Sequence, residues 1–215
     1  TTVQGTLESV LTQIFNQPIR VVGSGRTDAG THAVGQVVHF DAPKALAKPE
    51  TLVRSLNALL PDSAAVKAAW SAPDDFHALA SARRKTYVYR IWNNPIRSPL
   101  WHSRALHVPH PLNNELLTEL SSVILGRHDF KSFQNEGTPV KSTIRHIDRA
   151  YWVGPKKGLM EFRIRGNGFL KQMVRNIVGT LLYLERHGGQ PEDLQKILSA
   201  CNRAAAKATA PAHGL

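Results

Sequence analysis

The sequence predicts an α+β protein with a mainly antiparallel sheet flanked by helices. Apolar residues recur at helical spacing in some stretches and alternate at strand spacing in others. Several connections between the predicted strands are too short for the crossover that neighbouring parallel strands require. With 215 residues, of which 42% are hydrophobic, the chain can form one large domain or two small ones.

The first 70 residues predict two helices and three strands. Residues 3–16 predict an amphipathic helix, because Val3, Leu7, Val10, Leu11 and Ile14 fall on one face. Residues 19–22 and 34–40 predict strands on either side of a glycine-rich loop. Pro49 is well placed at the start of a second helix, and residues 65–70 predict a further strand.

A turn-rich stretch at residues 71–75 predicts a domain boundary near residue 75, because the charge balance changes there. Residues 1–75 carry 6 basic and 7 acidic side chains, whereas residues 76–215 carry 21 basic and 9 acidic ones. The whole chain has a net charge of +11. A positive field confined to one part of a chain attracts polyanions and favours a nucleic-acid partner. The alternative is a solvated basic surface with no partner.

The second part predicts strands and helices in alternation. Residues 86–92 alternate as a strand, which puts Tyr87 and Tyr89 on the same face. Residues 114–125 predict a helix that Gly126 would cap. The remaining elements are a hairpin of residues 144–153 and 159–165, a long helix at 169–187 and a shorter helix from Pro191 to about Cys201.

The glycine-rich loop between residues 23 and 30 is the most informative segment. It is neither a P-loop, since no Gly-Lys-Ser/Thr follows, nor the dinucleotide-binding fingerprint. It presents Arg26 and Asp28, a cation and a carboxylate two residues apart, in a constrained turn. One reading is a functional carboxylate; the other is an Asx-turn in which Asp28 binds its own loop backbone.

Other chemistry-bearing residues give weaker signals. His102, His107 and His110 have no carboxylate at metal-ligand spacing, so we expect no metal. Cys201 is alone, which excludes an internal disulfide and favours a small packed residue over a nucleophile. No transmembrane run is present and nothing marks the start of the sequence for export, so a cytoplasmic location is expected.

Aromatic and basic residues in the second part have two readings. Tyr87 and Tyr89 lie in a basic tract and could stack on unpaired bases, or they could be ordinary strand packing. Arg175 lies beside the apolar stripe of the long helix, where a solvated arginine is the ordinary expectation.

Several segments in order resemble the tRNA pseudouridine synthase A family, over nearly the whole chain. They are Thr2-Val-Gln-Gly-x-Leu-Glu, Gly25-Arg-Thr-Asp-Ala-Gly-x-His32-Ala, Asp75-Phe-His-Ala, Arg84-Lys-Thr-Tyr-Val-Tyr-Arg, Gly126-x-His-Asp-Phe-x-Ser-Phe133, Gly166-Asn-Gly-Phe-Leu, Met173-Val-Arg-Asn-Ile-Val-Gly179 and Ala210-Pro-Ala-His-Gly-Leu215. The Arg-Thr-Asp-Ala-Gly loop is highly specific for this family when it occurs together with the other segments.

The resemblance implies an isomerase that converts uridine to pseudouridine at positions 38, 39 and 40 of the tRNA anticodon stem-loop. It implies a two-domain α+β fold with a catalytic cleft between the domains, a homodimer, and no cofactor or metal. The domain of residues 1–75 would carry the catalytic loop, and the basic domain of residues 76–215 would bind tRNA.

The resemblance also assigns roles to four residues. Asp28 matches the catalytic aspartate, as nucleophile or as base, and Arg26 the arginine that displaces the target base. Tyr87 matches the tyrosine that packs on the uracil. Arg175 matches the arginine that pairs with the aspartate, where it would favour the charged form.

Three departures from the family pattern suggest an alternative function. Family members usually have a strand and a Tyr-Asp-Gly…Gly-Trp-Gln segment before Thr2-Val-Gln-Gly, and a further strand after Ala210-Pro-Ala-His-Gly-Leu215. Leu79 stands where an arginine commonly follows Phe-His-Ala. The alternative is therefore a tRNA-binding protein without turnover, because terminal strands are missing. A metal-dependent nuclease has little support without a carboxylate cluster.

Overall fold

The computed structural model describes residues 2–43, 48–137 and 140–215. The chain forms two compact units, one of Thr1–Arg26 with Val34–Ala82 and the other of Thr27–Ala33 with Arg83–Leu215. The sequence placed the boundary near residue 75 and the whole glycine-rich loop in the first domain. In the structure, Thr27–Ala33 belongs to the second unit, because its hydrogen bonds and its ion pair are made there.

Among its described residues, the first unit contains two helices and one short strand pair. Helix α1 (Val3–Phe15) begins at Thr2, whose hydroxyl caps Gly5, and helix α2 (Pro49–Leu59) begins at the predicted proline. Strands β1 (Val22–Gly23) and β2 (Val38–His39) pair antiparallel. The core of this unit consists of Val10, Leu11, Ile19, Val21, Leu52 and Leu56.

The predicted strands of the first unit are shorter than expected, because side chains, and not neighbouring strands, form hydrogen bonds with their backbone groups. Glu8 accepts a hydrogen bond from the Val21 amide, so residues 19–22 are fastened to α1 instead of to a longer strand. No strand forms at residues 65–70, which the structure describes in full. There the Asn57 side chain binds both the amide and the carbonyl of Val66.

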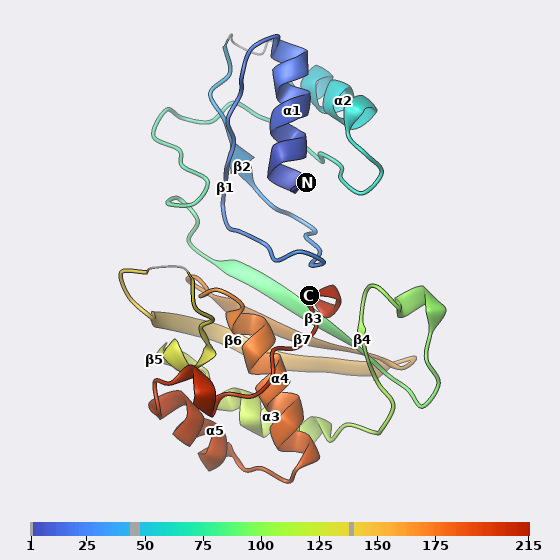
Figure 1. Ribbon diagram of the computed structural model, residues 1–215, viewed down its shortest axis with the longest axis vertical. Helices are drawn as coiled ribbons and strands as arrows, with labels where there is room; N and C mark the ends of the chain where they lie inside the picture. Colours follow the sequence, from blue (N-terminus) through green and yellow to red (C-terminus); the bar gives the residue numbers. More distant parts are fainter. Residues whose placement is uncertain (1, 44–47, 138–139) are drawn as a thin grey trace. The chain divides into compact units, whose positions relative to one another are not determined.

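The second unit is a five-stranded mixed sheet with helices on one face (Figure 1). Its strand order is β4-β3-β7-β6-β5, antiparallel except for the β3–β4 pair. The strands are β3 (Lys85–Asn93), β4 (Leu106–Val108), β5 (Gly126–Asp129), β6 (Ile144–Lys156) and β7 (Leu159–Gly166). The predicted hairpin is confirmed as β6 and β7. This α+β unit with a mainly antiparallel sheet agrees with the predicted fold class.

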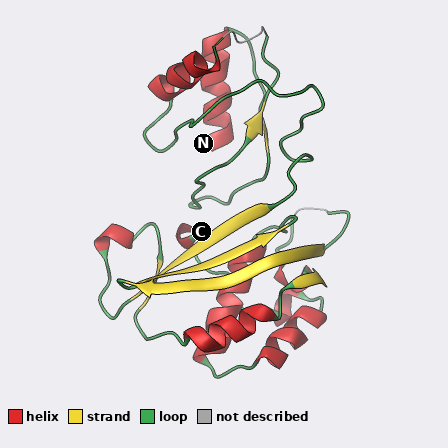
Figure 2. Ribbon diagram, turned by 180° about the vertical axis from the view of Figure 1, so that it is seen from behind, coloured by secondary structure: helices red, strands yellow, loops and turns green. Residues whose placement is uncertain are grey.

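Three helices cover the same face of this sheet, as the view from behind also shows (Figure 2). They are α3 (Asn114–Ser122), α4 (Met173–Arg186) and α5 (Pro191–Ser199). Short 3₁₀ turns lie at Pro99–Trp101, Lys131–Phe133, Arg203–Ala205 and Ala212–Gly214. The core between sheet and helices includes Tyr89, Phe162, Ile164, Met173 and Ile177.

Three helix ends differ from the predicted positions. Helix α4 begins at Met173 and not near residue 169, because Gln172 has a left-handed backbone (φ 58°). Helix α3 ends at Ser122, so Gly126 (φ 95°) serves the turn into β5 and does not cap the helix. Helix α5 ends at Ser199, short of Cys201, which is half-buried and unoxidised.

Candidate active site

Asp28 lies in a loop whose own hydrogen bonds leave its carboxylate available. The Thr31 amide and hydroxyl both donate to the backbone oxygen of Asp28, at 3.1 and 2.6 Å. The His32 amide donates to the backbone oxygen of Leu215 at 2.8 Å. Gly30 (φ 80°) closes the turn in a conformation that favours glycine. The loop is therefore held through its backbone, whereas the Asx-turn reading would have used the carboxylate.

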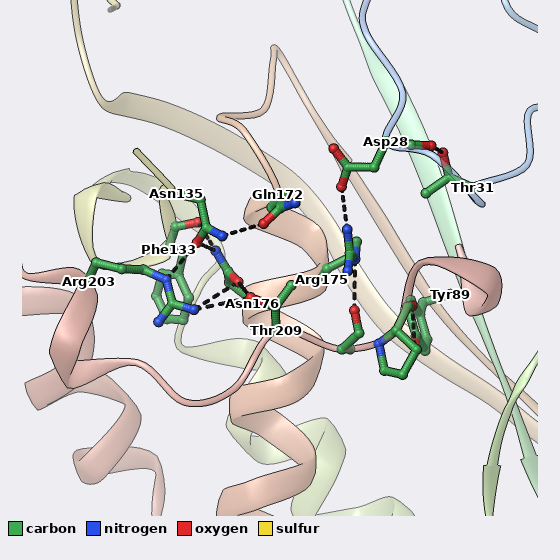
Figure 3. Close-up of polar contacts among 12 residues, drawn as sticks. Asp28, Thr31, Tyr89, Phe133, Asn135, Gln172, Arg175, Asn176, Arg203 and Thr209 are labelled. Carbon is green, nitrogen blue, oxygen red and sulfur yellow. Dashed lines mark hydrogen bonds and ion pairs between the residues drawn. The ribbon is translucent and has the colours of Figure 1, made fainter. Parts of the chain in front are cut away.

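The Asp28 carboxylate is paired with Arg175 (Figure 3). The Arg175 Nη1 donates to the Asp28 Oδ2 at 2.5 Å, and the two side chains are 13% and 28% exposed, respectively. Arg175 lies in the first turn of α4, where the helix dipole disfavours a cation. The carboxylate offsets that unfavourable position, so the two half-buried charges stabilise each other.

The guanidinium of Arg175 is held by a second contact in addition to Asp28. Its Nε donates to the backbone oxygen of Ala210 at 2.7 Å, and the Ala210 amide donates back to the Arg175 carbonyl at 3.1 Å. Because the guanidinium is a planar fork, fixing Nε also restricts where Nη1 points. Arg175 is therefore an anchored side chain and not the solvated helix arginine that was the ordinary expectation.

Tyr87 and Tyr89 share the helix-covered face of β3 but have different surroundings. Tyr87 is half-buried, with its ring edge-on to Phe169 at 4.9 Å between centroids. Burial, and next the negative charge of Asp28, raise the pKa of Tyr87. Tyr89 is 0% exposed, and its hydroxyl donates to the backbone oxygen of Pro211 at 2.8 Å. Burial also raises the pKa of Tyr89.

The four residues singled out in the sequence are thus divided between the two units. Asp28, Tyr87 and Arg175 belong to the second unit, where Arg175 contacts Asp28 directly and Tyr87 lies within reach of its charge. Arg26 is the last residue of the first segment of the first unit, and it is exposed.

A polar network that sequence reasoning missed holds the start of α4 (Figure 3). The buried Asn176 donates to the Phe133 carbonyl at 2.8 Å and to Asn135 at 2.9 Å. Arg203 donates to Asn135 and Asn176, and Asn135 donates to Gln172. A polar residue among the apolar stripe of the helix was the only sequence signal for this network. An open recess of about 440 Å³ beside it is lined by Asn135, Glu136, Lys171, Gln172 and Arg203.

Three arginines of β3 and β7, namely Arg90, Arg163 and Arg165, lie on the face of the sheet opposite the helices. Arg90 and Arg163 pair with Glu161, at 3.1 and 2.6 Å, and Arg165 pairs with Asp148 at 2.8 Å. The alternation along β3 therefore puts Arg90 and the two tyrosines on opposite faces, so they cannot form one stacking surface.

Two further observations on the described residues concern other classes of site. No three His, Cys, Asp or Glu side chains gather where they could hold a metal ion within the described ranges. Among the helices of the same residues, none is long and apolar enough to cross a membrane.

Comparisons with known proteins show the family of this chain. A family model described as tRNA pseudouridine synthase matches residues 1–79 and 122–215. The tRNA pseudouridine synthase A of Bdellovibrio bacteriovorus is 49% identical over 211 residues, which is 97% of this chain and 80% of that protein. The proteins of the same name from Maridesulfovibrio salexigens and Bacillus licheniformis are each 44% identical over the whole chain, covering 79% and 87% of their own lengths. The chain therefore belongs to the tRNA pseudouridine synthase family, a family of tRNA-modifying isomerases.

Proposed function

We propose that this protein converts uridine to pseudouridine at positions 38, 39 and 40 of the tRNA anticodon stem-loop, with Asp28 as the catalytic carboxylate. The choice of positions rests on the resemblance to the synthase A branch of the family. The observation that carries the assignment of Asp28 is its half-buried carboxylate, free of its own loop and paired with Arg175 at 2.5 Å.

The reaction is an isomerisation that needs no co-reactant. The bond between C1′ and N1 of the uridine breaks, the uracil turns, and C5 bonds to C1′; C5 then loses a proton and N1 gains one. A carboxylate serves this reaction either as a nucleophile at the sugar or as a base that removes a sugar proton. Both roles require an ionised carboxylate, and the Arg175 guanidinium is the cation that pairs with it.

Two further residues serve the target base in this proposal. The uridine lies in or beside a stem, so it must leave the stack at a cost of about a few kcal/mol. Arg26 would fill the vacated space, and the half-buried Tyr87 ring would contact the uracil. We also propose that a cleft between the two domains takes up the tRNA, that the protein acts as a homodimer and that it works in the cytoplasm.

The replacement Asp28→Asn tests the proposal, because an amide keeps the shape and loses the charge. Tritium released from C5 of labelled tRNA measures turnover, and gel shift measures binding. We expect Asp28→Asn to abolish release and to change tRNA affinity by no more than about threefold, since phosphate contacts dominate affinity. The exposed Asp74→Asn is the matched control and should keep both. Undiminished turnover by Asp28→Asn would sink the assignment.

The same tritium-release assay distinguishes the proposed enzyme from the alternative, a tRNA-binding protein without turnover. If the unaltered protein binds tRNA but releases no tritium, the chain is a tRNA-binding protein without turnover. Mapping of pseudouridine in the product tests positions 38, 39 and 40 separately from the chemistry.

A further inference from the structure

The segment of residues 208–215 contacts three other parts of the second unit through its backbone. Three of its backbone oxygens accept hydrogen bonds, each from a different element: Ala210 from Arg175 on α4, Pro211 from Tyr89 on β3, and Leu215 from His32 in the loop that carries Asp28. A single short segment thus joins the Asp28 loop to the helix and strand beside it. Figure 3 draws the bonds of Arg175 and Tyr89 to this segment.

The 208–215 segment lies too close to its neighbours to shift freely. A Cβ added to Gly179 of α4 would be 1.9 Å from the Ala208 oxygen. A Cβ added to Gly214 would be 2.5 Å from the ring of Tyr89. The backbone of the segment therefore rests directly on the helix and on the tyrosine ring.

The position of one carbonyl in this segment determines how Arg175 faces Asp28. The Ala210 oxygen binds the Arg175 Nε at 2.7 Å, while Nη1 of the same planar group binds Asp28. The next carbonyl along the chain, that of Pro211, is the one that Tyr89 holds at 2.8 Å. The two carbonyls lie on either side of Pro211, whose ring fixes its φ angle, so a displacement of the segment that moves the Pro211 carbonyl also moves the Ala210 carbonyl, the acceptor of Nε.

We propose that Tyr89 is a positioning residue for the proposed reaction, and that its hydroxyl acts through the 208–215 segment. By fixing the Pro211 carbonyl it fixes the Ala210 carbonyl, and so orients the Arg175 guanidinium toward Asp28. Tyr89 is fully buried, so it acts through these groups and not on the substrate. This inference rests on the proposed function of Asp28.

The replacement Tyr89→Phe removes only the hydroxyl and keeps the packed ring. We expect the single-turnover rate at saturating tRNA to fall about tenfold, the size of one lost hydrogen bond, while tRNA affinity stays within about twofold. The matched control is Tyr183→Phe on the exposed side of α4, which should keep the rate. The proposal holds that the rate depends on how Arg175 is oriented toward Asp28. A Tyr89→Phe rate within about twofold of the rate of the unaltered protein would therefore overturn it.

A double-mutant cycle with Arg175→Lys tests whether Tyr89 acts through Arg175. Lysine has no Nε–H for the Ala210 carbonyl, so the hydrogen bond that Tyr89 supports is already gone. Adding Tyr89→Phe to Arg175→Lys should then cost less than about twofold in rate, since linked residues are not additive. If the rate loss of the double variant equals the product of the losses of the two single variants, Tyr89 acts independently of Arg175, and the proposal is overturned.

A spectroscopic measurement tests the link without turnover. The Arg175 Nε–H resonance, assigned by its loss in Arg175→Lys, should exchange slowly with solvent in the unaltered protein and clearly faster in Tyr89→Phe. Unchanged exchange would contradict the proposed link. If Asp28→Asn keeps turnover, the proposed role of Asp28 fails and this measurement still decides the link. If Asp28→Asn is inactive and Tyr89→Phe is fully active, only the positioning role fails.

Discussion

Residues two positions apart on one strand face have different surroundings in this structure. Tyr87 and Tyr89 have the same side chain and neighbouring register, opposite Ile164 and Phe162 of β7. Tyr87 is half-buried, and burial together with the charge of Asp28 raises its pKa. Tyr89 is fully buried, and its hydroxyl donates to the Pro211 carbonyl. Their surroundings, and not their side-chain chemistry, therefore distinguish the substrate contact proposed for Tyr87 from the positioning role proposed for Tyr89.

Tyr87→Ala should lower the single-turnover rate strongly. Stacking of an aromatic ring on a base is worth about 1–3 kcal/mol, so the loss should be about 5- to 160-fold. Tyr87→Phe tests whether the hydroxyl also takes part. Tyr89→Ala is the comparison: it removes a fully buried ring, so it should lower the melting temperature in addition to the roughly tenfold loss in rate expected of Tyr89→Phe. If the rate falls equally for both alanine variants at matched stability, the assignment of Tyr87 is withdrawn.

At the scale of elements, strand alternation and helix starts arrange the chemistry. Because side chains alternate along β3 and β7, the arginines of these strands lie on the face opposite the helices, and Tyr87 and Tyr89 lie on the helix-covered face. The left-handed Gln172 starts α4 at Met173, which puts Arg175 in its first turn. A helix that began near residue 169 would have placed Arg175 a turn further from the helix start.

Gly179→Ala should destabilise the protein, although alanine in a helix interior ordinarily stabilises by about 1 kcal/mol over glycine. The added Cβ would lie 1.9 Å from the Ala208 backbone oxygen, so either α4 or the 208–215 segment must move. We expect a loss of about 2 kcal/mol or more in the free energy of unfolding by urea. Gly35→Ala, where nothing lies within 4 Å, is the control and should be close to neutral. A stabilised Gly179→Ala protein would show that the segment is not tightly seated.

At the scale of the whole molecule, the charge of the chain is concentrated in its second part, with 21 basic and 9 acidic side chains in residues 76–215. Part of it is neutralised within the sheet by Glu161 and Asp148, whose pKa values are lowered. For Glu161, burial opposes that lowering and the bonds from Arg163 and Arg90 outweigh it; for Asp148 the bond from Arg165 is the main cause. The cations outside these pairs are the ones that can meet phosphates.

Affinity for tRNA should therefore fall steeply with salt, with a slope of about −0.7 to −0.9 for each phosphate neutralised. Replacing the exposed Arg83, Arg97 and Arg104 by glutamine should make the slope shallower by about one for every phosphate that is no longer neutralised. Arg54→Gln, an exposed arginine of the first unit, is the control and should leave it unchanged. A flat dependence from low to physiological salt would show that the second part is not the tRNA surface.

Much of the fold and the family could be predicted from the sequence, because periodicity, proline and glycine positions and motif order are local signals. Residues 3–16, Pro49, the hairpin of β6 and β7, and the helix from Pro191 illustrate this. The short strands of the first unit could not be predicted, since Glu8 and Asn57 bind the backbone groups of Val21 and Val66 from 13 and 9 positions away, which strand periodicity does not reveal.

By itself, the sequence determined the family, the segregation of charge and the identity of Asp28 as a carboxylate in a glycine-rich loop. Only the tertiary structure decided that the Asp28 carboxylate faces Arg175, 147 positions along the chain, and that the 208–215 segment holds that arginine. The same holds for the difference between Tyr87 and Tyr89. The physical reason is that these interactions depend on where distant backbone carbonyls and side chains come to lie once the sheet and helices have packed, and no local pattern carries that information.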